Sequence, residues 1–293
     1  MTREKQQQDE PKRPIDGAPI RTRELPTEVA QARLDATADD AANEKAARPR
    51  IDAVLTACKL AAHELETLHR RYAEITDLDL TGYSRASAIW LLSGRTLGLL
   101  RALLVQVEAG IGNEVLITGR AIHEASRVLF AFAAPGADDV VRLWLEDEGR
   151  TGYVKQGMAR AAEERYETAL AETMQDAGLT RIGSTKEKTE TLYDLMSRAA
   201  HNRRSSCVDA VWEPGRQMAY GWNQSAIRRA GYTAWAASMT TEVLNSVGDA
   251  LRALYSQPRF FTERILPLVK GIDAVRQSAP LDEQSIRRES GTS

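Results

Sequence analysis

The stretch NEVLITGRAIHEASRVLFAFAAPG, residues 113–136, decides the fold class of this chain. It follows the break Gly110-Ile111-Gly112 and stops at Pro135-Gly136, so signals for both ends of a helix lie in the sequence. At 100° per residue its apolar side chains occupy most of the circumference, which is typical of a helix packed on several sides. Because only a short break separates it from the preceding helical pattern, we expect two neighbouring antiparallel helices.

Helical periodicity continues on both sides of this stretch, with apolar residues at spacings of three and four. It predicts helices over residues 50–77, 84–109, 114–134, 138–176, 186–203, 225–255 and 258–275. Residues 208–222 alternate instead and contain Pro214-Gly215, which is typical of a short β-hairpin. We therefore expect a mainly α protein, a helical bundle of six to seven helices with a short β-hairpin insert and disordered termini.

The two ends of the chain differ in composition from its middle. Residues 1–50 and 276–293 contain no Phe, Trp or Tyr and are polar throughout, so they bury little apolar surface. The sequence predicts a disordered N-terminal arm over 1–49, in which 28–48 could form only a transient helix. One helical bundle domain follows over 50–275, and a disordered tail over 276–293.

Charge, cysteine content and the absence of certain motifs exclude several classes of function. The 39 basic and 41 acidic residues give a net charge of −2, so no overall positive field attracts nucleic acid or an anionic membrane. No uninterrupted apolar run approaches the ~18 residues that a membrane helix needs, and Cys58 and Cys207 are far apart. No phosphate-binding glycine loop, dinucleotide fingerprint or zinc spacing occurs. We expect a cytoplasmic protein without cofactor, metal or membrane partner.

The helix over 114–134 carries one polar stripe. Arg120, His123, Glu124 and Arg127 fall within a sector roughly 100° wide. Glu124 lies four residues after Arg120 and three before Arg127, so its carboxylate can pair with both guanidinium groups. Two interpretations stay open: a surface ladder of ion pairs, or a groove in which the arginines bind phosphate oxygens.

The helix over 186–203 carries a second arginine and histidine pair, Arg198 and His201, followed by Asn202, Arg203 and Arg204. A histidine near a helix C-terminus is favourable with the helix dipole, which is one interpretation. The other is a cationic cluster beside an imidazole, which could hold a phosphodiester next to a general acid or base.

The remaining side chains of the 186–203 helix separate into two faces. Its core face is expected to consist of the apolar residues Leu192, Met196, Ala199 and Ala200. The opposite face carries Asp194 and Ser197 beside His201, but a serine in mid-helix provides neither the sharp turn nor the oxyanion hole of a catalytic triad. His123, Glu124 and His201 could meet as a metal site, although the nearby arginines disfavour a cation.

Three stretches together resemble a known family: 119–133, the charged segment 143–146, and 192–201 followed by the expected hairpin. Over roughly 85–255 the chain is similar to a bacterial helical family of unknown function that itself resembles the HEPN superfamily. The resemblance implies a four- or five-helix bundle, frequent dimers with a cleft at the interface, and metal-independent RNA cleavage by an arginine and a histidine.

The chain departs from the ribonuclease pattern of that superfamily at one point. Two residues separate Arg198 from His201, whereas the active pattern has four to six. Arg120 or Arg127 on the neighbouring helix could take the place of the missing arginine.

Two functions are carried forward. The first is a HEPN-like factor directed at RNA, a ribonuclease or RNA-binding protein in stress or defence, that forms a homodimer. It has His201, Arg198 and Arg120 as catalytic residues. Its substrate-binding residues are Arg127, Glu124, His123, Asn202, Arg203 and Arg204. The alternative is a non-catalytic helical module that dimerises or binds a partner, with a structural polar cleft.

Overall fold

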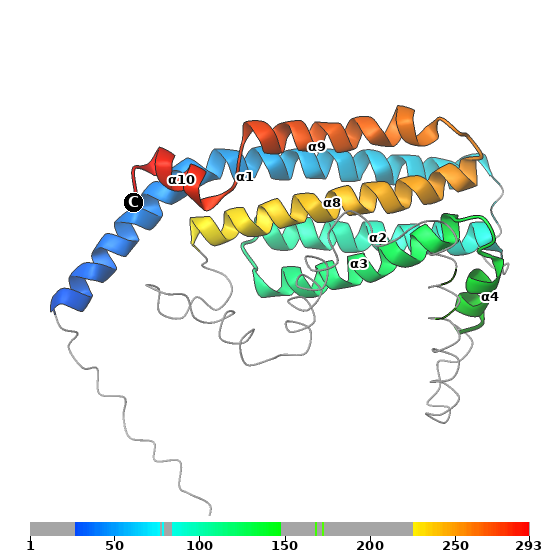
Figure 1. The fold of residues 1–293 in the computed structure, drawn as a ribbon, viewed down its shortest axis with the longest axis horizontal. Coiled ribbons are helices and arrows are strands. Elements are labelled where there is room, and N and C mark those ends of the chain that lie inside the picture. Colours follow the sequence, from blue (N-terminus) through cyan, green and yellow to red (C-terminus); the bar gives the residue numbers. More distant parts are fainter. Residues whose placement is uncertain are drawn as a thin grey trace, which may run out of the picture.

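A computed structural model describes residues 27–76, 78, 84–147, 168, 172 and 225–292 (Figure 1). All regular elements in these ranges are helical. They are α1 (Thr27–Ile75), α2 (Arg85–Glu108), α3 (Asn113–Ala133), α4 (Asp138–Asp147), α8 (Ala226–Tyr255), a π-helical turn η2 (Phe261–Ile265), α9 (Leu266–Ser278) and α10 (Glu283–Ser290). The mainly α class is confirmed, while the expected β-hairpin over 208–222 and the helix over 186–203 lie outside the described residues.

The central helix of the bundle is α8. It packs against α1, α2, α3 and α9, and consecutive members of that set also pack against one another, α9 on α1, α1 on α2 and α2 on α3 (Figure 1). Its residues Ala236, Val243, Val247 and Leu251 are fully buried in one contiguous hydrophobic core. This burial is the main source of stability that the described helices share.

The helix boundaries around α2 and α3 follow the sequence signals closely. Ser84 caps α2 through a capping box with Ser87. Gly110 adopts φ 73° in the break before α3, and Gly136 adopts φ 78° after it, a backbone conformation that glycine accepts at little cost. The residue before Pro135 is extended, as proline requires, so α3 ends at Ala133. The predicted ends of these two helices are confirmed within a residue or two.

Among the described helices, α2 alone is long and apolar enough to cross a membrane, by length and composition only. Half of its apolar window is buried, and the helix contacts α1, α3, α4 and α8. Core helices of soluble proteins have the same length and composition, and Arg95 and Arg101 interrupt this one.

The first helix is longer than the sequence indicates. The expected disordered arm 1–49 overlaps α1, which begins at Thr27 and continues through Pro49. Figure 1 shows the blue N-terminal part of α1 bent away from the rest, as expected for a proline that removes one helical hydrogen bond. The predicted C-terminal boundary of the disordered arm, residue 49, is therefore too late. Residues 1–26 lie outside the described residues.

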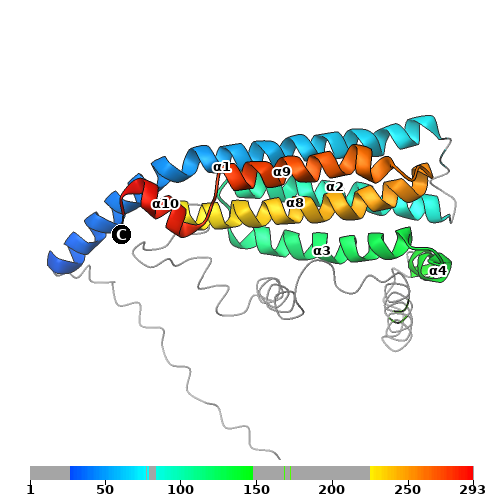
Figure 2. The ribbon, with the colours of Figure 1, turned by 45° about the horizontal axis from the view of Figure 1, so that its top comes forward.

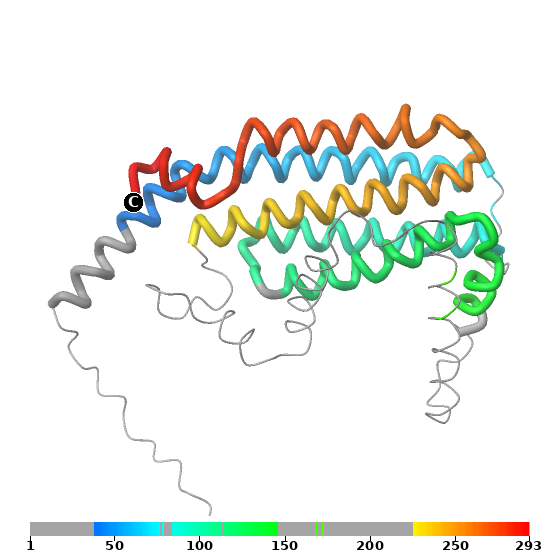
Figure 3. The backbone as a smooth tube through the Cα atoms, in the orientation of Figure 1, coloured from blue at the N-terminus to red at the C-terminus, as the bar shows by residue number. Residues whose placement is uncertain are grey.

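The expected disordered tail 276–293 is also largely helical. The last turn of α9 reaches Ser278, and α10 packs on α1 with Ile286 fully buried (Figure 3). Asn43 of α1, itself only 4% exposed, accepts hydrogen bonds from Ser290 Oγ at 2.7 Å and Thr292 Oγ1 at 2.9 Å. Neither the N-terminal part of α1 nor α10 has enough apolar residues for its sequence to predict burial. In the structure the two segments pack on each other and bury these residues.

Candidate functional site

The polar stripe of α3 lies partly at its seam with α8. The predicted pair of Arg120 and Glu124 is present, with Nε donating to Oε1 over 2.8 Å. Their side chains are 21% and 48% exposed, so water screens the pair only in part. An isolated helical pair of this kind contributes a few tenths of a kcal/mol.

His123 has a partner that the sequence analysis missed. Its Nδ1 lies 2.8 Å from Oε1 of Glu242 on α8, and both side chains are about four-fifths buried. Glu242 is the one charged residue between Arg229 and Asp249 in an otherwise uncharged run, which is the signal that could have found it. The imidazole therefore links two helices instead of standing alone on a solvent face.

Two further contacts hold α3 and α8 in register. Ser246 Oγ donates to Ser126 Oγ at 3.1 Å in the buried interface. At Gly119 the indole ring of Trp235 occupies the space of a side chain, since a Cβ built there would lie 1.8 Å from the ring. Residues 119, 123 and 126 of α3 thus contact residues 235, 242 and 246 of α8, and the numbers rise in the same order along both helices. The two helices are parallel neighbours, side by side in Figure 2.

Arg127 is the exception in the stripe. The expected second pair with Glu124 does not form, and within the part of the chain that the structure describes Arg127 has no ion pair or hydrogen bond. Its side chain is half-buried beside the α3–α8 seam, seven residues after Arg120 and so on the same face of α3. A guanidinium in this position is available to an anion.

The other half of the expected site cannot be placed beside the stripe. His201, Arg198, Asn202, Arg203 and Arg204 all lie outside the described residues. The structure therefore brings together Arg120, His123, Glu124 and Arg127 on α3. Among the described residues no three potential ligands converge on a point where they could hold a metal ion.

Outside the stripe, one cysteine and one histidine are buried in the helical bundle. Cys58 of α1 is fully buried, and burial raises the pKa of its thiol to about 11, against a smaller opposing effect of its hydrogen bond with Thr240. His69 stacks on Trp90 with ring centroids 4.6 Å apart, and its Nε2 donates to the Trp90 carbonyl over 2.9 Å. Burial lowers the pKa of His69, so the ring is neutral near pH 7. Both residues connect helices of the core, and neither suits a catalytic role.

The fold and the site define a mainly α helical bundle with a half-buried stripe of arginine, histidine and glutamate at the seam of two parallel helices. Comparisons with protein-family models, with curated proteins and with solved structures each find no match to this chain.

Proposed function

We propose that the protein is a HEPN-like factor directed at RNA, which binds a phosphodiester through the polar stripe of α3. The observation that supports this best is Arg127, a half-buried arginine with no carboxylate partner among the described residues. A guanidinium group binds phosphate oxygens through two parallel N–H donors, and a partly desolvated site strengthens such bonds. Arg120 lies two turns earlier on the same face and would contribute a second positive charge.

In the catalytic version of this proposal His201 supplies the proton transfer. Its imidazole would act as general acid or base at the ribose hydroxyl or the leaving oxygen. Arg198 and Arg120 would stabilise the negative charge that develops on the phosphate, and no metal ion is needed for that chemistry. Asn202, Arg203 and Arg204 would hold the substrate next to it, and the protein would act as a homodimer.

The RNA-binding test compares two single arginine variants of the full chain. Arg127→Ala is expected to weaken binding of a fluorescent RNA by about tenfold and to reduce the salt slope by about one, as for loss of one phosphate contact. Arg101→Ala on α2 is the matched control, since the Arg101 side chain is 71% exposed and pairs with Glu66 at 3.4 Å. Equal binding by the two variants would contradict the proposal.

The cleavage test uses the same RNA with the wild type and His201→Ala. Cleavage by the wild type in the presence of a chelator, and none by the variant at unchanged RNA affinity, is the expected result. Equal cleavage by both would remove the catalytic version and leave RNA binding alone.

A non-catalytic module that dimerises or binds a partner is the second candidate, and the contact between His123 and Glu242 favours it. That contact uses the imidazole of the stripe to join α3 to α8, which is a structural role. If this function is correct, the wild type neither binds nor cleaves RNA, and Glu242→Gln lowers the melting temperature.

A further inference from the structure

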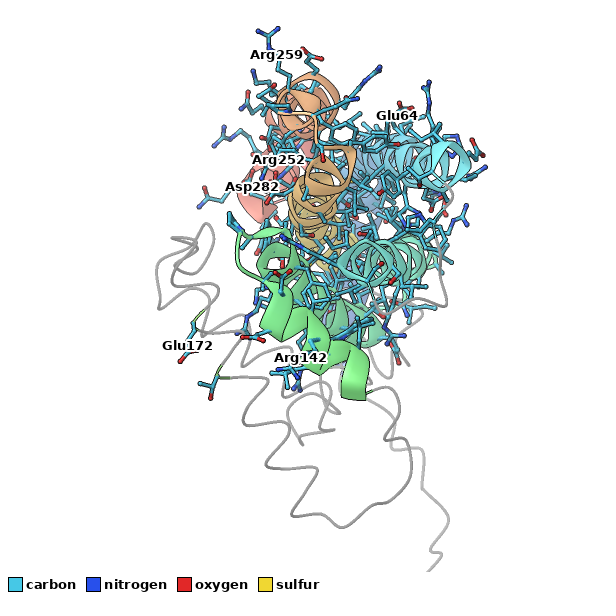
Figure 4. All side chains as sticks on the ribbon, turned by 90° about the vertical axis from the view of Figure 1, so that its right-hand side faces the viewer. Glu64, Arg142, Glu172, Arg252, Arg259 and Asp282 are labelled. Carbon is cyan, nitrogen blue, oxygen red and sulfur yellow. The ribbon has the colours of Figure 1, made fainter. Side chains whose placement is uncertain are left out.

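The central helix α8 has one face that no described helix covers. Around α8 the helices follow the order α9, α1, α2, α3, and α3 does not pack extensively against α9, so the ring stays open between these two. The open face of α8 consists of residues that are all partly or fully exposed: Ile227, Gly231, Ala234, Ser238, Thr241, Asn245, Asp249 and Arg252. In Figure 4 the labelled Arg252 lies on the side of α8 away from α1, which carries Glu64.

The path of the chain requires a segment to return along the bundle. Because α3 and α8 are parallel, the chain finishes α3 and α4 at one end and must begin α8 at the other. A 30-residue helix such as α8 is about 45 Å long at 1.5 Å per residue. Residues 148–224 span this gap, and a parallel pair of helices always needs such a crossover.

Two apolar residues of α3 are buried on this side of the bundle. Leu116 and Phe130 are only 8% and 7% exposed, yet neither belongs to the contiguous core that the described helices form. Leu116 lies one turn before Arg120, and Phe130 lies three residues after Arg127, so both are on the side of α3 that borders the open face. Thr241 Oγ1 on the open face is also buried without a hydrogen-bond partner.

We propose that the open face of α8, as far as its border with the stripe of α3, is the docking surface for residues 186–203 of the same chain. This segment has the expected helical pattern and an apolar face of Leu192, Met196, Ala199 and Ala200. The small side chains of Gly231, Ala234 and Ser238 let a helix approach α8 closely. An 18-residue helix is about 27 Å long and fits within the length of the face.

The charges on the two surfaces also agree. Arg127 of α3 lies on one border of the docking surface, and Asp249 of α8 lies on the face itself. The segment offers both signs, with Asp194 and Arg198 one turn apart. The inference rests on topology and burial, so it stands or falls independently of any action on RNA.

Photo-cross-linking in the full chain tests this docking. A benzophenone amino acid is placed at Ser238, the middle of the open face, and at Thr67 on the exposed face of α1 as the matched control. Irradiation of the Ser238 variant is expected to give an intramolecular product whose cross-linked peptide maps to 186–203, and the Thr67 variant is expected to give none there.

Cross-links that join two copies, or that reach only α3 and α9, would overturn the proposal. If the Ser238 variant does not fold, as judged by its helical circular dichroism, Asn245 on the same face takes its place with the same expected peptides.

Discussion

At the scale of single residues, two glycines in helix interiors have opposite roles. A Cβ at Gly119 would lie 1.8 Å from the Trp235 ring, whereas a Cβ at Gly98 of α2 would meet nothing within 4 Å. Gly119 therefore allows α3 to pack closely on α8. At Gly98 the packing of α2 leaves room for a larger side chain.

Alanine substitution at these two positions should change stability in opposite directions. Gly119→Ala is expected to lower the free energy of unfolding by about 1–3 kcal/mol, because the methyl group forces Trp235 out of its position. Gly98→Ala is expected to raise it by about 0.5–1 kcal/mol through the lower entropy of the unfolded chain. Urea denaturation measures both, and a Gly119→Ala variant as stable as Gly98→Ala would refute the packing role.

The pH dependence of stability should carry a contribution from His69. Burial lowers its pKa in the folded state, so the unfolded chain binds a proton at a higher pH than the native protein does. The free energy of unfolding therefore falls as the pH drops below about 6.5, the ordinary pKa of histidine. Above that pH the imidazole is neutral in both states, and its contribution is constant.

Urea denaturation at pH 7.5 and pH 5.5 measures this effect. His69→Gln, whose amide can still donate to the Trp90 carbonyl, is expected to lose less stability between the two pH values than the wild type. His63→Gln on the exposed face of α1 is the control and should behave like the wild type. Equal losses in all three proteins would show that His69 does not titrate as its burial requires.

At the scale of elements, α10 depends on one apolar side chain and a few polar contacts. Ile286 is fully buried, Arg50 Nη1 donates to the Pro280 carbonyl over 2.9 Å, and Arg50 also pairs with Glu289. A helix of this length does not hold together alone in water. Its order therefore comes from docking on α1.

Ile286→Ala should release α10 from the bundle. Removal of a fully buried isoleucine side chain costs about 2–5 kcal/mol, more than an eight-residue helix can lose. Hydrogen exchange is expected to show loss of amide protection in α10 and near Asn43, with α2 and α3 unchanged. Arg288→Ala, on the exposed face of α10, should leave the protection intact. Full protection in the Ile286 variant would contradict this account.

The elements that the sequence predicted well are those with a wide apolar stripe and a chemical signal at one boundary, a start or a stop. α2, α3 and α8 all have both, with Ser84, Pro135 and Ser225 at their boundaries. The N-terminal half of α1 and the short α10 lack a wide apolar stripe, because Asn43, alanines and the single apolar side chain of Ile286 make their contacts. Hydrophobic periodicity does not predict the packing of these two segments, since the sequence of each segment alone is too polar to indicate a buried face.

The candidate site was predictable within one helix and not between helices. Spacing alone found Arg120 with Glu124, because residues four apart share a face. It could not find Glu242, which meets His123 from a distance of 119 residues along the chain. It also predicted a pair between Glu124 and Arg127 that the described structure lacks, since Glu124 bonds to Arg120 instead.

At the scale of the whole molecule, the order of helices along the chain differs from their order in space. α8 is central, but it is encoded after α1 to α4, and α9 and α10 then return to α1. Most contacts between the described helices therefore join helices that are not consecutive in the chain. Proteins with such non-local contacts fold more slowly than simple up-and-down bundles.

The late position of α8 has a consequence during synthesis on the ribosome. Until Leu251 has left the exit tunnel, the buried faces of α1, α2 and α3 have no central helix to cover them. The nascent chain then exposes a large apolar surface for several seconds at ordinary rates of translation, which invites aggregation or capture by chaperones. The hydrogen bonds of Asn43 form later still, because Ser290 and Thr292 follow Leu251 along the chain.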